Sequence, residues 1–96
     1  MSAYRLTPKA QRDLDEIFEY TFAHWGEAQA EQYIRDLQAA IETVAERPAI
    51  AGACDEIRPG YRRILAGSHV TFLKPTPEFV ESIRILHAWM DFARRL

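Results

Sequence analysis

The chain has 96 residues and a mass of 11.1 kDa, with 48% apolar and 27% charged residues. A chain of this length buries about 65% of its surface around one core, so residues 1–96 are expected to form a single domain. The composition excludes a largely disordered chain, and no apolar run reaches the roughly 18–20 residues that a membrane span needs.

Cysteine content and the start of the chain bear on location. A single cysteine, Cys54, excludes an internal disulfide and is typical of a reducing compartment. The first residues lack the charged-then-apolar pattern of a secretory signal peptide. We therefore expect a cytoplasmic protein without a membrane partner.

The net charge of −2 is unevenly distributed. Residues 1–56 carry five basic and eleven acidic side chains, whereas residues 57–96 carry seven basic and three acidic ones. Such a division favours a directional surface that meets an anionic partner on one side. The alternative is that the charges only solvate two exposed faces.

The N-terminal quarter predicts a short strand and a long helix. Residues 3–6 alternate in character and are expected to form the strand. Thr7 then suits a helix N-cap, and Pro8 suits the first helical position. An apolar stripe at helical spacing follows, from Ala10 to Trp25. The acidic residues beside it are predicted to form a solvated face: Asp13, Asp15, Glu16 and Glu19.

A second helical stripe follows Gly26 at once, from Ala30 to Val44, and Pro48 ends it. Two helices joined by about one glycine are expected to fold back as an antiparallel hairpin, because neither buries its stripe alone. Residues 48–59 are predicted to form a long connection.

The C-terminal part changes from helical to alternating periodicity. Residues 61–65, 69–73 and 79–86 predict three strands separated by turn-like segments. Residues 89–96 are expected to form a short helical element that docks through Trp89, Phe92 and Leu96. The predicted class is α+β with the order β-α-α-β-β-β, in which the helix hairpin covers one face of a small, mainly antiparallel sheet.

The other sheet face is predicted to be uncovered and apolar-basic, as partner sites often are. A three-residue loop at 66–68 would direct one set of side chains to the helices: Ile64, Val70, Phe72, Ile83 and Ile85. The same register would direct a second set outward: Tyr61, Arg63, Leu65, His69, Thr71, Leu73, Ser82, Arg84 and Leu86.

Several kinds of chemistry are disfavoured by residue spacing. His24, His69 and His87 lack metal-ligand spacing, so no metal site is expected. No nucleophile motif is present. The four glycines never cluster into a phosphate loop, and no cofactor is expected. Cys54 is predicted to be inert, and Trp25 and Trp89 are predicted to be core or docking anchors.

A cluster of cations leaves two interpretations open. Arg62, Arg63 and Arg84 on adjacent strands could bind phosphate, and His87 could transfer a proton during RNA cleavage. The alternative is that the arginines hold carboxylates of a partner and that His87 caps a strand end.

Nearly the whole chain resembles the ParE/RelE superfamily of toxins in type II toxin–antitoxin modules, and the ParE branch more closely. Each motif is weak alone, but their order and spacing together are fairly specific. They are Tyr4-Arg5-Leu6, Asp13-Leu14-Asp15-Glu16-Ile17, His24-Trp25-Gly26, Gly60-Tyr61-Arg62-Arg63, Gly67-Ser68-His69-Val70-Thr71-Phe72, Ile83-Arg84-Ile85-Leu86-His87 and Met90-Asp91.

The resemblance implies a cognate antitoxin whose disordered C-terminal segment wraps the toxin. ParE members poison DNA gyrase, whereas RelE members cut ribosome-bound mRNA with basic strand residues and a tyrosine or histidine near the C-terminus. Arg63, Arg84 and His87 could imitate that ribonuclease set. No tyrosine lies near the end of this chain, however, so the lead interpretation is a non-enzymatic gyrase inhibitor. The alternatives are a RelE-like endoribonuclease and a degenerate toxin that acts only as co-repressor.

Two surfaces are predicted for these partners. The antitoxin is expected to contact the apolar-basic sheet face through Arg63, Leu65, Leu73, Arg84 and Leu86. The target is expected to contact the C-terminal tail through Trp89, Arg94 and Arg95.

Overall fold

Three α-helices, one 3₁₀ turn and five strands account for most of residues 3–96, the part of the chain that the computed structural model describes. They are β1 (Ala3–Leu6), α1 (Pro8–Trp25), α2 (Glu27–Glu46), η1 (Pro48–Ile50), β2 (Gly52–Ala53), β3 (Arg62–Ala66), β4 (His69–Pro75), β5 (Phe79–His87) and α3 (Phe92–Arg95). The predicted α+β class and the order of the main elements are confirmed.

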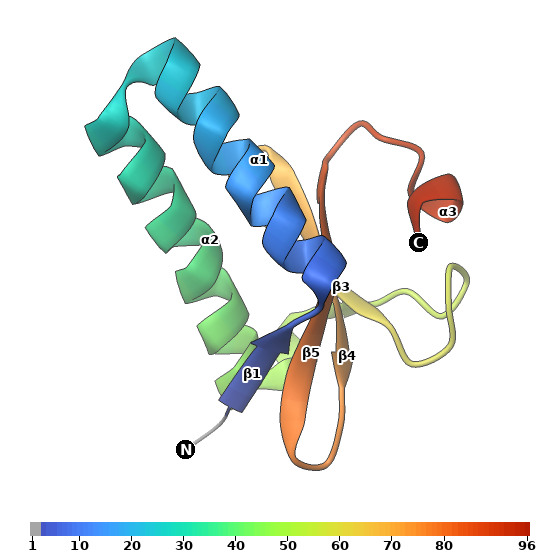
Figure 1. Cartoon of the computed structure of the whole chain (residues 1–96). Helices are drawn as coiled ribbons and strands as arrows, with labels where there is room; N and C mark the ends of the chain where they lie inside the picture. The colour runs from blue at the N-terminus through green and yellow to red at the C-terminus, as the bar shows by residue number, and fades with distance from the viewer. Residues whose placement is uncertain (1–2) are drawn as a thin grey trace.

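The strands form one mixed sheet in the order β1-β5-β4-β3-β2. β1 runs parallel to β5, and the other neighbours are antiparallel. β2 was not predicted, because its two residues lie inside the connection expected at 48–59. Figure 1 shows the α1–α2 hairpin on one side of the sheet and α3 on the other.

The start of α1 follows its predicted capping. The Thr7 Oγ1 atom accepts a hydrogen bond from Ala10 N at 3.0 Å and donates one to Ile83 O at 2.8 Å. Pro8 occupies the start of the helix, where its missing N–H leaves no bond unmade. Thr7 therefore ties the first turn of α1 to β5. No helix within residues 3–96 is long and apolar enough to cross a membrane.

One core lies between the hairpin and the sheet. The apolar stripes of α1 and α2 bury Leu14, Ile17, Leu37 and Ile41 against side chains of β4 and β5. Burying each large apolar side chain contributes roughly 1.5–3 kcal/mol. This contact fixes the distance between α1 and β5, between which the site described below is formed.

The β3–β4 turn is shorter than predicted, and the predicted register of β4 is therefore wrong. Ala66 pairs with His69, so only Gly67 and Ser68 form the loop. Gly67 has a φ of 57°, the positive value that a two-residue type II′ turn requires at its first position. A change of one residue in the loop reverses the faces of the whole strand.

The reversal exchanges the predicted side-chain sets on β4. Thr71 pairs with Ile64 and Leu73 belongs to the helix-side core, together with Ile85. Val70 and Phe72, predicted to face the helices, belong to the cluster on the other face. Two further residues predicted to face outward are on the helix side: His69, which bonds to α2, and Ser82, which pairs with Leu73.

The second sheet face is covered by the chain itself except at β3, where Arg63 and Leu65 remain exposed, so the prediction of a wholly uncovered face is wrong. A second cluster contains buried Cys54, Val70, Phe72 and Leu86. Side chains of the loop after β2 and of the tail pack over it: Ile57, Tyr61, Met90, Phe92 and Leu96. The rings of Phe72 and Phe92 meet edge to face at 4.8 Å. Burial also raises the pKa of the Cys54 thiol, in keeping with an unreactive residue.

Gly67→Ala is expected to destabilise the chain through two effects. The left-handed conformation alone costs an alanine about 1–2 kcal/mol. A Cβ at this position would also lie 2.6 Å from a carbon of the Tyr33 ring. Gly60→Ala is the matched control, since Gly60 has a φ of 82° but nothing within 4 Å of such a Cβ. Urea denaturation should show a larger loss for Gly67→Ala, and equal losses would contradict the close contact with Tyr33.

Candidate functional site

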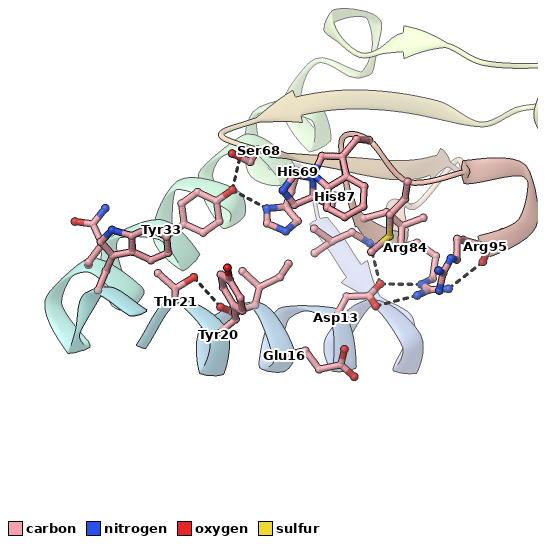
Figure 2. A pocket seen from close by; sticks show the side chains of 17 residues that line it. Asp13, Glu16, Tyr20, Thr21, Tyr33, Ser68, His69, Arg84, His87 and Arg95 are labelled. Atoms are coloured by element: carbon pink, nitrogen blue, oxygen red, sulfur yellow. Dashed lines mark hydrogen bonds and ion pairs between the residues drawn. The ribbon is translucent and has the colours of Figure 1, made fainter. Parts of the chain in front are cut away.

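A cavity of about 600 Å³ lies between α1, the part of α2 at Gln29 and Tyr33, the ends of β4 and β5 next to the β3–β4 turn, and the segment that follows β5. Helix α1 contributes Tyr20 and Trp25 to its lining, the strands contribute His69 and His87, and the following segment contributes Trp89. Figure 2 shows these elements on opposite sides of the cavity, with α1 below and the strands above. The volume is in the range of ligand-sized pockets.

Tyr33 of α2 fixes the orientation of His69 at one end of the cavity. The Tyr33 hydroxyl accepts a hydrogen bond from Ser68 N at 2.9 Å and lies 2.6 Å from His69 Nδ1. Among the described residues Nδ1 is the acceptor within hydrogen-bond distance of this hydroxyl, so we assign the hydroxyl proton to the bond with Nδ1. Neutral His69 then carries its proton on Nε2, which points away from Tyr33. Gly67 permits this arrangement, because any side chain there would meet the Tyr33 ring.

His69 and His87 form a cross-strand pair. They lie directly opposite each other in the antiparallel ladder, and their ring centroids are 5.1 Å apart. Burial, and then the proximity of His87, lower the pKa of His69, while Asp13 opposes the shift. The His87 ring also packs against Trp89, at 4.6 Å between centroids, and its Nδ1 atom is buried without a hydrogen-bond partner.

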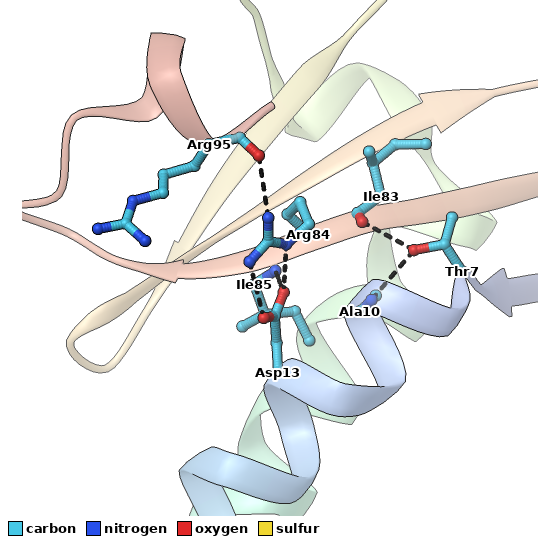
Figure 3. A network of polar contacts seen from close by, with 7 residues as sticks. All are labelled: Thr7, Ala10, Asp13, Ile83, Arg84, Ile85 and Arg95. Atoms are coloured by element: carbon cyan, nitrogen blue, oxygen red, sulfur yellow. Dashed lines mark hydrogen bonds and ion pairs between the residues drawn. The ribbon is translucent and has the colours of Figure 1, made fainter.

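Asp13 and Arg84 form a two-pronged ion pair at the other end of the cavity (Figure 3). Asp13 accepts from Arg84 Nε at 2.8 Å and from Nη2 at 3.0 Å. It also accepts from the backbone N–H of Ile85 at 2.9 Å. The hydrogen bond from Asp13 raises the pKa of Arg84. Arg84 in addition donates to the carbonyl of Arg95 at 2.9 Å, so this cluster joins α1, β5 and the tail.

Three large aromatic side chains around the cavity remain exposed to solvent. The exposed fractions are 59% for Tyr20, 64% for Trp25 and 78% for Trp89. Both tryptophans were predicted to be core or docking anchors, and that prediction is wrong for the free chain. Exposed tryptophan and tyrosine beside a pocket are typical of residues that dominate binding energy in interfaces.

The three residues considered for RNA cleavage do not converge. Arg63 is exposed on β3, and Phe72 lies between it and Arg84 in the strand register. The guanidinium of Arg84 is engaged by Asp13, and the two side chains are only 18% and 11% exposed. His87 lines the cavity beside His69 rather than beside Arg63.

The predicted antitoxin residues divide into exposed and buried groups. Arg63 is exposed and Leu65 is 65% exposed, so both are available to a partner. Leu73 and Leu86 are buried on opposite faces of the sheet, and their predicted exposure is wrong. Arg84 is held by Asp13.

The residues predicted to contact the target are exposed in the C-terminal tail. Trp89 precedes α3, and Arg94 and Arg95 are exposed at its end. Arg94 pairs loosely with Asp91 at 3.5 Å, a surface contact that contributes little to stability.

Asp13, Tyr33 and His69 are the site residues that sequence reasoning missed. Asp13 was assigned to a solvated helix face, yet it lies one turn from both Ala10 and Ile17 of the buried stripe. A carboxylate at the edge of a buried helical stripe indicates that a cation faces it, so the sequence does contain a signal for this ion pair. Tyr33 and His69 gave no such signal, because their contact depends on the length of the β3–β4 turn.

The described part of the chain contains no set of metal ligands. Within residues 3–96, no group of three or more histidine, cysteine or carboxylate side chains is arranged to hold a metal ion. The cavity therefore offers aromatic surface, imidazoles and hydrogen-bond donors.

The sequence matches the model of the ParE toxin of the type II toxin–antitoxin system parDE over residues 4–92. It is 51% identical over 96 residues to Toxin ParE1 of Mycobacterium tuberculosis, covering 99% of this chain and 98% of that one. It is 45% identical over 91 residues to Toxin ParE1 of Caulobacter vibrioides, covering 95% and 94%.

A solved structure described as the chromosomal ParDE TA system from P. aeruginosa has the same fold. Its chain superposes with a TM-score of 0.77 at 18% identity, covering 91% of this chain and 96% of that one. Sequence and fold together define a small toxin of the type II toxin–antitoxin class. Within that class the chain belongs to the ParE family, whose toxins pair with a ParD antitoxin in a ParDE system.

Asp13→Asn is expected to lower the free energy of unfolding by roughly 2–3 kcal/mol, because it leaves the partly buried Arg84 without its counter-ion. Asp15→Asn, an exposed change two residues along the same helix, should cost no more than about 0.5 kcal/mol. Urea denaturation of the two variants measures the difference. Equal stabilities would show that the ion pair does not hold α1 to β5.

Proposed function

We propose that this chain is a single-domain cytoplasmic toxin that inhibits growth by binding DNA gyrase and that a ParD-type antitoxin neutralises it. The family match over residues 4–92 and the near-complete coverage of its relatives support a single domain. A cytoplasmic location follows from the target, because gyrase acts on chromosomal DNA.

The state of Arg84 is the observation that favours binding over catalysis. A ribonuclease of the proposed type would need free cations to stabilise phosphate charge beside a proton-transferring residue. Arg84 instead gives two guanidinium nitrogens to Asp13 and a third to the carbonyl of Arg95. Arg84 therefore positions α1 and the tail. Arg63, the other arginine considered for RNA cleavage, does not lie beside His87.

The tail is the proposed contact with gyrase. Phe92 and Leu96 pack on the sheet and so hold α3 in place. Trp89, Arg94 and Arg95 are thereby presented at fixed positions on the surface. An exposed tryptophan with neighbouring arginines suits an acidic protein surface with an apolar pocket.

The antitoxin is proposed to bind both the cavity and the exposed residues of β3. Its segment would bury the exposed rings of Tyr20, Trp25 and Trp89 as it enters the cavity. Exposed Arg63 and Leu65 on β3 would meet a second part of it. A disordered segment that folds on binding can cover separated features of this kind.

A second candidate, a RelE-like endoribonuclease, is favoured by one observation. His69, His87 and the Tyr33 hydroxyl lie together in the cavity, and paired imidazoles can move protons. In that case His87 would be essential, since general acid–base catalysis typically contributes about 10²–10⁴-fold in rate.

His87→Ala separates the two candidates. For a toxin that works by binding, this variant should keep substantial growth inhibition and should still stabilise cleaved DNA with purified gyrase. Supercoiling and cleavage assays with gyrase, run beside a ribosome-dependent mRNA cleavage assay, provide the measurement. mRNA cleavage by the unmodified chain that disappears with His87→Ala would contradict the gyrase proposal.

Two charge variants should separate the target surface from the antitoxin surface. Arg63→Glu should weaken antitoxin binding by a few kcal/mol, if Arg63 meets a buried carboxylate, without reducing gyrase inhibition. Arg94→Ala/Arg95→Ala, which spares Phe92 and Leu96, should reduce growth inhibition more than it reduces antitoxin affinity. Truncation after Met90 should likewise cost toxicity more than antitoxin binding.

Calorimetry and growth assays measure both effects, and thermal unfolding verifies that each variant is folded. Lys9→Glu, an equal charge change at the exposed start of α1, is the control for both assays. Full toxicity in a folded Arg94→Ala/Arg95→Ala variant would remove the tail from the target surface. An unchanged antitoxin affinity for Arg63→Glu would remove Arg63 from the antitoxin surface.

A further inference from the structure

The Asp13 carboxylate is not available to a ligand in the cavity. Both oxygens of Asp13 accept hydrogen bonds, from two nitrogens of Arg84 and from the Ile85 N–H. Glu16 is also among the lining residues, but it is exposed and its side chain is directed outward in Figure 2. Asp13 therefore offers no free oxygen to a ligand beside the two histidines.

Hydrogen-bond donors, by contrast, remain unused. His69 Nε2 carries the proton that the Tyr33 contact assigns to it and lies on the ring edge away from Tyr33. His87 has a ring nitrogen, Nδ1, that is buried without a partner. Tyr20 extends from α1 toward the two histidines in Figure 2. The Nε2–H of His69 and the Tyr20 hydroxyl can each donate to an acceptor, and both ring nitrogens of His87 donate when that ring is protonated. A carboxylate is the strongest acceptor among amino-acid side chains.

The charged and titratable groups around the histidine pair give the same indication. Each packed element contributes to this set: Asp13, Glu16 and Tyr20 from α1, Tyr33 from α2, His69 from β4, Arg84 and His87 from β5, and Arg95 from the tail. Asp13 and Arg84 neutralise each other. Exposed Glu16, Arg95 and the two imidazoles remain, and the last three favour an anion.

The charge of the cavity wall favours a polypeptide over a nucleic acid as the carrier of the anion. Helices α1 and α2 form much of the wall, and residues 8–46 contain nine acidic and three basic side chains. That wall repels a polyanionic backbone. A single carboxylate on an otherwise apolar segment suits the aromatic rim formed by Tyr20, Trp25 and Trp89.

We propose that the cavity receives one aspartate or glutamate side chain of the antitoxin, held by His69, His87 and Tyr20. The inference rests on the proposed neutralisation by an antitoxin and adds the chemistry that anchors it. The apolar neighbours of that acidic residue cover the aromatic rim and exclude water from the pair.

Such an anchor makes antitoxin binding depend on pH. A carboxylate beside the histidine pair stabilises its protonated form, so the complex takes up protons that the free toxin lacks. Affinity therefore rises as the pH falls from 8 to 6, a range in which the antitoxin carboxylate stays ionised. An average uptake of about a quarter to a half of a proton over these two pH units tightens binding by about threefold to tenfold.

The test uses the full chain and the ParD-type antitoxin encoded with it. Dissociation constants are measured at pH 6 and pH 8 from tryptophan fluorescence, because both tryptophans of the chain line the cavity. The unmodified toxin should bind about threefold to tenfold more tightly at pH 6. His87→Gln should remove most of that difference, and His24→Gln, at the one histidine outside the lining, should keep it.

A second arm identifies the carboxylate. Each aspartate and glutamate of the antitoxin segment is replaced by its amide, and one replacement should abolish the pH dependence as His87→Gln does. Tight binding that is independent of pH and unaffected by His87→Gln would overturn the inference while leaving neutralisation intact. Failure of the antitoxin to bind or to restore growth would instead contradict the proposed function.

A third arm tests whether a nucleic acid, rather than the antitoxin, occupies the cavity. A single-stranded oligodeoxynucleotide is titrated into the toxin without antitoxin, and no saturable change in tryptophan fluorescence is expected. A change that requires His87 would assign the cavity to nucleic acid and overturn the inference.

Discussion

The ion pair between Asp13 and Arg84 is the contact on which the arrangement of the site depends. It joins the first half of α1 to β5, and Arg84 extends the connection to the backbone of the tail. Thr7 fastens the start of the same helix to β5 nearly two turns earlier. The wall of the cavity and the tail are therefore positioned by one partly buried pair, whose disruption leaves an uncompensated charge.

The same constraint limits the chemistry of this toxin. An arginine whose guanidinium is bonded to a carboxylate does not stabilise a phosphate. The residues that resemble a ribonuclease set, Arg63, Arg84 and His87, therefore do not act together. The cavity retains aromatic rings and two imidazoles, which suit recognition of a partner segment. The proposed function needs two such surfaces, and we assign the tail to the target and the cavity to the antitoxin in that proposal.

Helical periodicity and capping residues were sufficient to predict α1, α2 and the α+β class, because these signals are local. The faces of β4 were predicted wrongly, since they depend on whether the β3–β4 loop has two or three residues. That one residue moved His69 into the cavity and Leu73 into the core. Coverage of the second sheet face by Phe92 and Leu96 depends on long-range packing, and no local pattern contains it.

The central claim, that Arg84 holds the fold and does not contact phosphate, is tested most directly by removing both charges at once. Asp13→Asn/Arg84→Gln keeps side chains of similar size that can hydrogen-bond, without leaving a lone buried charge. Growth inhibition, measured beside urea denaturation, should remain substantial in this double variant, which should be more stable than either single variant. A well-folded double variant that no longer inhibits growth would contradict the account and assign the Arg84 charge to the target.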